Sequence, residues 1–147
     1  MTASPETFIG TWRLLSWVIT DDAGRKTEPM GPAPWGLLTY AADGYMFAML
    51  GAEPSTRARF PGSDPLAGTP EEAHRAMSTC HSYCGRWRID GDSLVHTVEG
   101  ALWPNMVGTQ QVRHYRFDGD RVILKTPPMT RKGASGIAEL TWTRVQA

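Results

Sequence analysis

The chain has 147 residues, of which 41% are hydrophobic and 20% charged, as in an ordinary folded domain. The formal net charge is zero, with 15 basic and 15 acidic residues, so no basic footprint for nucleic acid or an anionic membrane is present. The start of the chain, Met1 to Phe8, lacks the basic and then apolar order of a leader, and no apolar run approaches the ~18 residues of a membrane span. We therefore expect one cytoplasmic domain over residues 1–147, with no nucleic-acid or membrane partner.

Eight strand-like runs follow one another along the chain. They are expected at Gly10 to Thr20, Trp35 to Ala41, Tyr45 to Leu50, Ser82 to Asp90, Ser93 to Ala101, Gly108 to Phe117, Arg121 to Thr126 and Ile137 to Arg144. Their spacing and the turn signals between them indicate an all-β barrel or sandwich.

The connections between these runs alternate in kind. Three are tight turns built on Gly and Asp, at residues 41–44, 90–92 and 118–120, and four are longer, at residues 21–34, 51–81, 102–107 and 127–136. In a meander, successive connections lie at opposite ends, so the short turns would close one end and the long loops would ring the other. The pattern predicts an eight-stranded antiparallel up-and-down β-barrel with room for one small ligand.

One short helix is predicted between the third and fourth strands. Thr69, Pro70 and Glu72 supply an N-cap, a first-turn proline and a capping-box acid, and the helix should run from about Pro70 to Cys80. Its narrow apolar stripe includes Met77. We expect this helix to pack at the mouth as a lid or plug, since a loop this long is usually functional or mobile. We see no apolar outer stripe of the kind that an interaction module would carry.

Alternation along the strands assigns the inward faces. The clearest inward sets are Tyr83, Gly85, Trp87 and Ile89; Val122, Leu124 and Thr126; and Ala138, Leu140 and Trp142. His96 shares a face with Leu94 and Val98 and should therefore be interior. Strands two and three are apolar on both sides, so their inward residues stay unassigned.

The sixth strand carries polar groups on both faces. Its aromatic residues place Gln111, Arg113 and Tyr115 inside, and His114 and Arg116 in solvent. Pairing of neighbouring strands predicts that His96 lies opposite Trp87 on one side and Tyr115 on the other. It also places Arg113 opposite Val98 and Leu124.

Several short motifs, in this order, resemble the bacterial and fungal lipocalin-like domain family from about Phe8 to Val145. They are Gly10-Thr11-Trp12, Gly44-Tyr45-Met46, Pro104-Asn105, Gly108-Thr109-Gln110-Gln111-Val112-Arg113 with Tyr115, and Thr141-Trp142-Thr143-Arg144. The resemblance implies an eight-stranded barrel with an internal ligand cavity, often associated with secondary metabolism, and an arginine that covers a tryptophan at the closed end. Related barrels include both binders and cyclases or isomerases. The resemblance supplies no catalytic set.

The predicted interior contains a cationic side chain but no acidic side chain. Arg113 has no evident internal carboxylate partner, so a ligand carboxylate, enolate or polarised carbonyl could supply the counter-charge. The candidate catalytic residues are Arg113, His96, Tyr115 and Gln111, and the candidate ligand contacts are Trp87, Tyr83, Trp103, Tyr40, Trp35 and Met77. Two structural alternatives stay open: Arg113 could stack on a tryptophan and bond Gln111 and main-chain carbonyls, and His96 could be a core histidine bonded to Tyr115.

These residues lead to two hypotheses of function. The first is a cofactor-independent enzyme that isomerises or cyclises a largely apolar, oxygenated metabolite, polyketide-like or aromatic, with Arg113 and Gln111 stabilising negative charge on oxygen. The second is a carrier or sequestering protein for such a metabolite. No cofactor or metal is expected, because Cys80 and Cys84 with His74 and His81 match no familiar zinc spacing.

Overall fold

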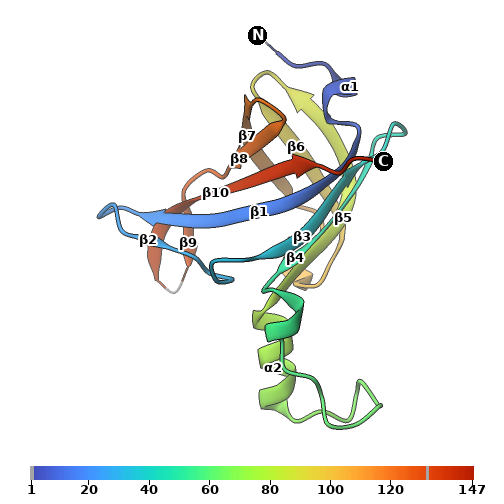
Figure 1. Cartoon of the computed structure of the whole chain (residues 1–147), viewed down its shortest axis with the longest axis vertical. Coiled ribbons are helices and arrows are strands. Elements are labelled where there is room, and N and C mark those ends of the chain that lie inside the picture. The colour runs from blue at the N-terminus through green and yellow to red at the C-terminus, as the bar shows by residue number, and fades with distance from the viewer. Residues whose placement is uncertain (1, 132) are drawn as a thin grey trace.

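A computed structural model describes residues 2–131 and 133–147 (Figure 1). One antiparallel sheet curls until its first strand pairs with its last long strand, which closes a barrel of eight strands. The barrel strands are β1 (Gly10–Asp21), β3 (Trp35–Tyr40), β4 (Tyr45–Gly51), β5 (Cys80–Asp90), β6 (Ser93–Ala101), β7 (Gln110–Asp118), β8 (Arg121–Lys125) and β10 (Ala134–Arg144). The predicted fold class is therefore confirmed.

Short elements that the sequence pattern missed extend this frame. The strands β2 (Lys26–Thr27) and β9 (Met129–Arg131) pair antiparallel with the mouth-side ends of β1 and β10 (Figure 1). The others are helix α1 (Pro5–Phe8) and two 3₁₀ turns, Pro54–Thr56 and Pro104–Met106. Strands of two or three residues carry too little alternation to be detected in a sequence.

The three tight turns lie together at one end of the barrel. Gly44, Gly91 and Gly119 adopt positive φ in them, which residues with a side chain rarely do. The longer connections leave the other end, as the alternation of loop lengths predicts. The barrel thus has a closed end near α1 and a mouth at the opposite end.

The closed end is sealed by the N-terminal segment and the last strand. Trp12 donates from Nε1 to the Phe8 carbonyl at 2.8 Å, and the Arg144 guanidinium lies 4.3 Å above the Trp12 ring. Arg144 also donates to the Ile9 carbonyl at 2.7 Å and to the Thr7 carbonyl. The expected arginine over the tryptophan is present.

A bulge in β1 changes which residues face inward. Leu14 pairs with Trp142, but the next pair is Ser16 with Thr141, so one extra residue is inserted at this point. Leu14 and Trp17 are consequently both buried although they are three positions apart. Simple alternation along the strand would have placed Trp17 outside.

The helix after β4 does not form a lid. Helix α2 (Pro70–Ser78) has the predicted capping box between Thr69 and Glu72, but none of its residues is buried. It extends away from the barrel below β4 and β5 (Figure 1). The lid prediction is wrong because the apolar stripe of α2 is too narrow to hold it against the mouth; Met77 stays 44% exposed.

The register between β6 and β7 also differs from the prediction. His96 pairs with Gln111 rather than Tyr115, and Arg113 pairs with Leu94 rather than Val98. Both strands keep their predicted inward faces because the shift is an even number of residues. The pairing of His96 with Trp87 on the other side is confirmed.

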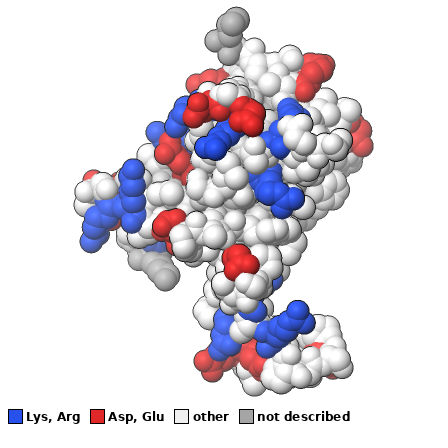
Figure 2. Space-filling model, viewed as in Figure 1, with Lys and Arg blue, Asp and Glu red and all other residues white. Residues whose placement is uncertain are grey.

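The outer surface is less uniformly polar than the sequence suggested. Phe47 and Met49 on β4 are 57% and 46% exposed, and Leu37 and Leu102 line the same shallow groove. The expectation of no outer apolar stripe was therefore wrong for this face. Elsewhere positive and negative side chains are interspersed on the face shown in Figure 2. No helix among the described residues is long and apolar enough to cross a membrane.

Candidate functional site

An internal cavity of about 90 Å³ lies between the core and the mouth. This is several times the ~15 Å³ that one water needs. Its apolar lining includes Trp17, Leu38, Leu50, Leu124, Leu140 and Trp142. Its polar lining comprises His81, Tyr83, His96, Arg113, Thr126 and Arg131. A largely apolar wall with a few convergent polar groups is typical of a small-molecule site.

His96 stands between two tyrosines. The Tyr40 hydroxyl lies 2.8 Å from Nε2 and the Tyr83 hydroxyl 2.8 Å from Nδ1, so both ring nitrogens are occupied. The three side chains are almost completely buried. Burial, reinforced by the charge of Arg113, lowers the pKa of His96 to about 3. The ring is therefore neutral at pH 7, with one nitrogen donating and the other accepting.

Burial also keeps both tyrosines protonated. It raises the pKa of Tyr40 well above its usual value, and it raises the pKa of Tyr83, where the positive charge of Arg113 opposes the shift. The chain from Tyr40 through His96 to Tyr83 is thus neutral, and Tyr83 brings it to the cavity wall.

Arg113 provides positive charge inside this neutral surrounding. Its guanidinium donates to its neighbour's carbonyl, Val112 O, at 2.8 Å and to Gln111 Oε1 at 3.3 Å. Among the described residues it forms no ion pair, and no residue that lines the cavity carries a carboxylate. The remaining guanidinium donors are available to an acceptor in the cavity.

The mouth strengthens the same electrostatic pattern. Burial, and then the charges of Arg113 and Arg131, lower the pKa of His81 to about 4, so this side chain is also neutral at pH 7. The charged lining residues Arg113 and Arg131 are both cationic. An anion or a polarised oxygen would be attracted to this cavity.

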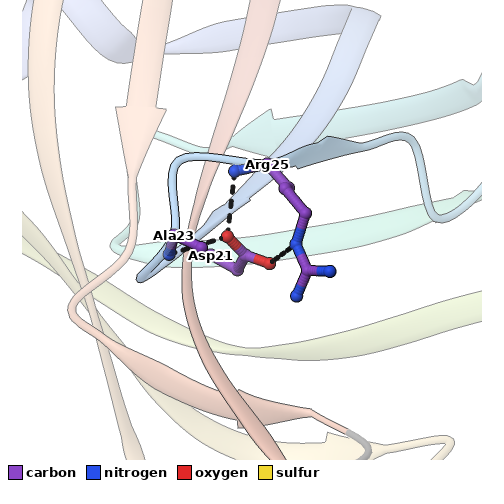
Figure 3. Close-up of polar contacts among 3 residues, drawn as sticks. All are labelled: Asp21, Ala23 and Arg25. Carbon is purple, nitrogen blue, oxygen red and sulfur yellow. Dashed lines mark hydrogen bonds and ion pairs between the residues drawn. The ribbon is translucent and has the colours of Figure 1, made fainter.

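A carboxylate near the mouth is already engaged. Asp21, at the end of β1, accepts from the backbone N–H groups of Ala23 and Arg25 at 2.9 Å each and from Arg25 Nε at 2.8 Å (Figure 3). Chiefly the backbone bond from Arg25 lowers the pKa of Asp21. Asp21 and Arg131 line the same surface groove beside the mouth, but the Asp21 carboxylate is held by its own turn.

The predicted site residues separate into three groups. Arg113, His96 and Tyr83 line the cavity. Tyr40 and Gln111 lie directly behind them as hydrogen-bond partners, and Trp87 packs on Tyr40 with ring centres 4.8 Å apart. The remainder lie elsewhere: Tyr115 bonds Gly91 O and Ala3 N at the closed end, and Trp103, Trp35 and Met77 are outside the cavity lining.

The expected contact between His96 and Tyr115 is therefore absent. The register shift moves Tyr115 toward the closed end, where it packs edge-on against Phe8. Tyr40 and Tyr83 take its place beside His96. Tyr40 lay on a strand that is apolar on both sides, so the sequence contained no signal for its direction.

Some cavity residues were not predicted as ligand contacts. Trp17 enters through the β1 bulge, and Trp142 was assigned inward without a role. His81, Met129 and Arg131 reach the cavity from the rim. The tryptophans of β1 and β10 are visible in the sequence. The bulge in β1 breaks the alternation, however, so the sequence does not indicate that Trp17 and Trp142 face the same side of the sheet.

Two histidines and two cysteines lie close together in the sequence, within residues 74–84. Cys80 and Cys84 are free thiols in the structure. Within residues 2–131 and 133–147, no three His, Cys, Asp or Glu side chains come together in a way that could hold a metal ion.

An up-and-down barrel with a closed end, a mouth and an apolar cavity defines the class of small ligand-binding barrels. The family model described as a lipocalin-like domain matches residues 9–145, so the chain belongs to that family. It is also similar to the 4'-hydroxy-3'-methoxypropiophenone carrier protein ppsC of Aspergillus oryzae. The two are 31% identical over 93 residues, which cover 57% of this chain and 84% of the carrier. Fold and family together support small-molecule binding.

Proposed function

We propose that this protein binds a small, oxygenated aromatic metabolite of secondary metabolism inside the barrel and carries it unchanged. The observation that carries the proposal is Arg113, a guanidinium at the wall of a largely apolar cavity whose lining has no carboxylate and whose other charged residue, Arg131, is also cationic. A charge in this position is costly unless acceptors surround it. A ligand oxygen with negative or partial negative charge would complete its hydrogen bonds.

The similarity to a carrier suggests the first probe. The carrier's own ligand, 4'-hydroxy-3'-methoxypropiophenone, has an aromatic ring for the apolar wall and a carbonyl, a methoxy group and a hydroxyl as acceptors. Titration of the purified protein with this ketone in a calorimeter gives the Kd. Native mass spectrometry of the protein as purified would identify a different ligand if one is already bound.

Substitution of Arg113 tests the role of the charge. Arg113→Met removes the guanidinium and keeps an unbranched side chain, and we expect the Kd for the ketone to rise by about 10-fold or more, the value of one charged hydrogen bond. The control is Arg116→Met, on the same strand but exposed. Equal Kd values for both variants and the wild type would remove Arg113 from the site.

A catalytic function is the second candidate, favoured by the Tyr40, His96 and Tyr83 chain. Isomerisation or cyclisation of a ketone removes a proton beside the carbonyl and returns one elsewhere, and this chain could move that proton while Arg113 holds the enolate oxygen. Incubation with the bound metabolite separates the candidates: unchanged recovery supports the carrier. Conversion that His96→Gln abolishes without loss of binding supports the enzyme.

A further inference from the structure

The barrel interior contains two buried donors without protein partners. The indole N–H groups of Trp17 and Trp142 have no hydrogen-bond acceptor among the described residues. The side chains are 9% and 2% exposed, and both line the cavity. Nearly all buried N–H groups in proteins are paired, because an unpaired donor costs about 1–3 kcal/mol.

Other tryptophans in the chain show what the usual arrangement is. Trp12 donates to Phe8 O at 2.8 Å and Trp87 to Ala41 O at 3.0 Å. Trp17 and Trp142 thus differ from these two buried or half-buried indoles in lacking a protein acceptor. Their shared position on the cavity wall gives a reason for the difference.

Strand pairing makes the two tryptophans neighbours on the inner face of the sheet. Trp17 pairs with Leu140 and Trp142 with Leu14, so the tryptophans are diagonal neighbours on the inner faces of β1 and β10. Arg113 lies on β7, with β8 between it and β10. The donors therefore occupy two separate parts of one cavity wall.

We infer that Trp17 and Trp142 form an acceptor-binding subsite, and that the ligand is an aromatic compound with acceptor oxygens at two positions. One oxygen meets the Arg113 guanidinium and another accepts from the indole pair. This inference rests on the proposed binding function and specifies its ligand class. An aryl ketone with ring oxygens has this pattern, whereas an alkylbenzene does not.

The test compares two probes of similar shape. 4'-Hydroxy-3'-methoxypropiophenone carries the acceptors and propylbenzene carries none. Calorimetry with Trp17→Phe and Trp142→Phe should show an about 5-fold weaker Kd for the ketone per indole, as expected for one lost neutral hydrogen bond. The Kd for propylbenzene should rise by a clearly smaller factor, because this probe loses only contacts with the removed ring atoms and no hydrogen bond. Trp103→Phe, at an indole outside the cavity lining, is the matched control.

Nuclear magnetic resonance of the unsubstituted protein tests the subsite even if a variant does not fold. In ¹⁵N-tryptophan-labelled protein, the ketone should shift the indole N–H resonances of Trp17 and Trp142 downfield and slow their exchange, while propylbenzene should not. Unchanged ketone affinity in both variants, equal losses for both probes, or no indole shift would overturn the subsite. If the wild type binds no ketone, the result contradicts the proposed function. If the wild type binds the ketone but substitution of the indoles leaves the Kd unchanged, the result contradicts only the subsite.

Discussion

At the scale of single residues, the cavity is organised around one guanidinium and the neutral groups near it. Burial, and then repulsion by Arg113, keep His96 and His81 neutral. Gln111 accepts from the guanidinium and donates to the Thr109 hydroxyl at 2.9 Å, which fixes its orientation. A ligand bound as proposed would therefore encounter a preorganised donor rather than a mobile charge.

The depressed pKa of His96 makes stability depend on pH. The unfolded chain takes up a proton on this histidine near pH 6.5, whereas the folded protein does so only near pH 3. The unfolded state thus binds more protons between these values, so the free energy of unfolding falls as the pH drops below 6.5. We expect His96 alone to contribute a loss of about 2 kcal/mol between pH 7 and pH 5.

Urea unfolding at the two pH values measures this loss. His96→Gln keeps one donor and one acceptor for the tyrosines but does not titrate. Between pH 7 and pH 5, the loss in its free energy of unfolding should therefore be about 2 kcal/mol smaller than the loss in the wild type. The same pH dependence in the wild type and His96→Gln would mean that His96 is protonated in the folded protein.

Part of the site could be predicted from single residues. Alternation placed His96, Tyr83 and Arg113 inward, and the structure confirms it. The hydrogen-bond partners could not be predicted, because they depend on strand register. Alternation along a strand is insensitive to a shift by an even number of residues, and such a shift exchanged Tyr115 for Gln111 opposite His96.

At the scale of elements, the strands were more predictable than the segments between them. Most barrel strands combine alternation with a turn signal at one end, and β3 and β4, which are apolar on both sides, still flank a clear turn. The strands β2 and β9 are too short to show either signal. The capping box of α2 was a local signal and is present. The packing of α2 depends on contacts with the rest of the chain and not on its own capping residues, and the expected position over the mouth was wrong.

The segment that contains α2 offers a test of its independence from the barrel. It holds itself together: Arg57 donates to Ala76 O at 3.0 Å and to Thr79 Oγ1 at 3.1 Å. The strands on either side already form a hairpin, since Gly51 pairs with Cys80 and Ala52 N donates to Thr79 O at 3.0 Å. A two-residue Asn-Gly turn between Ala52 and Thr79 could therefore replace residues 53–78.

We expect this shortened protein to fold and to bind the aromatic ketone within about twofold of the wild-type Kd, because α2 buries no residue and does not line the cavity. Far-UV circular dichroism checks the fold and calorimetry checks the Kd. Binding weakened by about 10-fold or more in the shortened protein would restore a lid function for α2.

At the scale of the whole molecule, the barrel has one stabilised end and one accessible end. The closed end buries Phe8, Tyr40 and Trp12 and carries the short turns, while the mouth carries the long connections and Arg131. Pairing of β1 with β10 completes the ring, so the contacts at the ends of these two strands support closure of the sheet. The contacts that seal the closed end are thus separate from the residues of the proposed ligand site.

This division predicts that the closed end can be weakened without changing the cavity. Arg144→Lys keeps the positive charge but loses the planar stacking on Trp12 and at least one of the bonds to Ile9 O and Thr7 O, because lysine lacks the guanidinium fork. We expect the free energy of unfolding to fall by about 1–3 kcal/mol, measured by urea titration. Arg121→Lys, at an exposed position on β8, should have no comparable effect. The Kd for the ketone should stay at the wild-type value wherever the variant is folded; a parallel loss of affinity would show that closure of the barrel also determines the shape of the cavity.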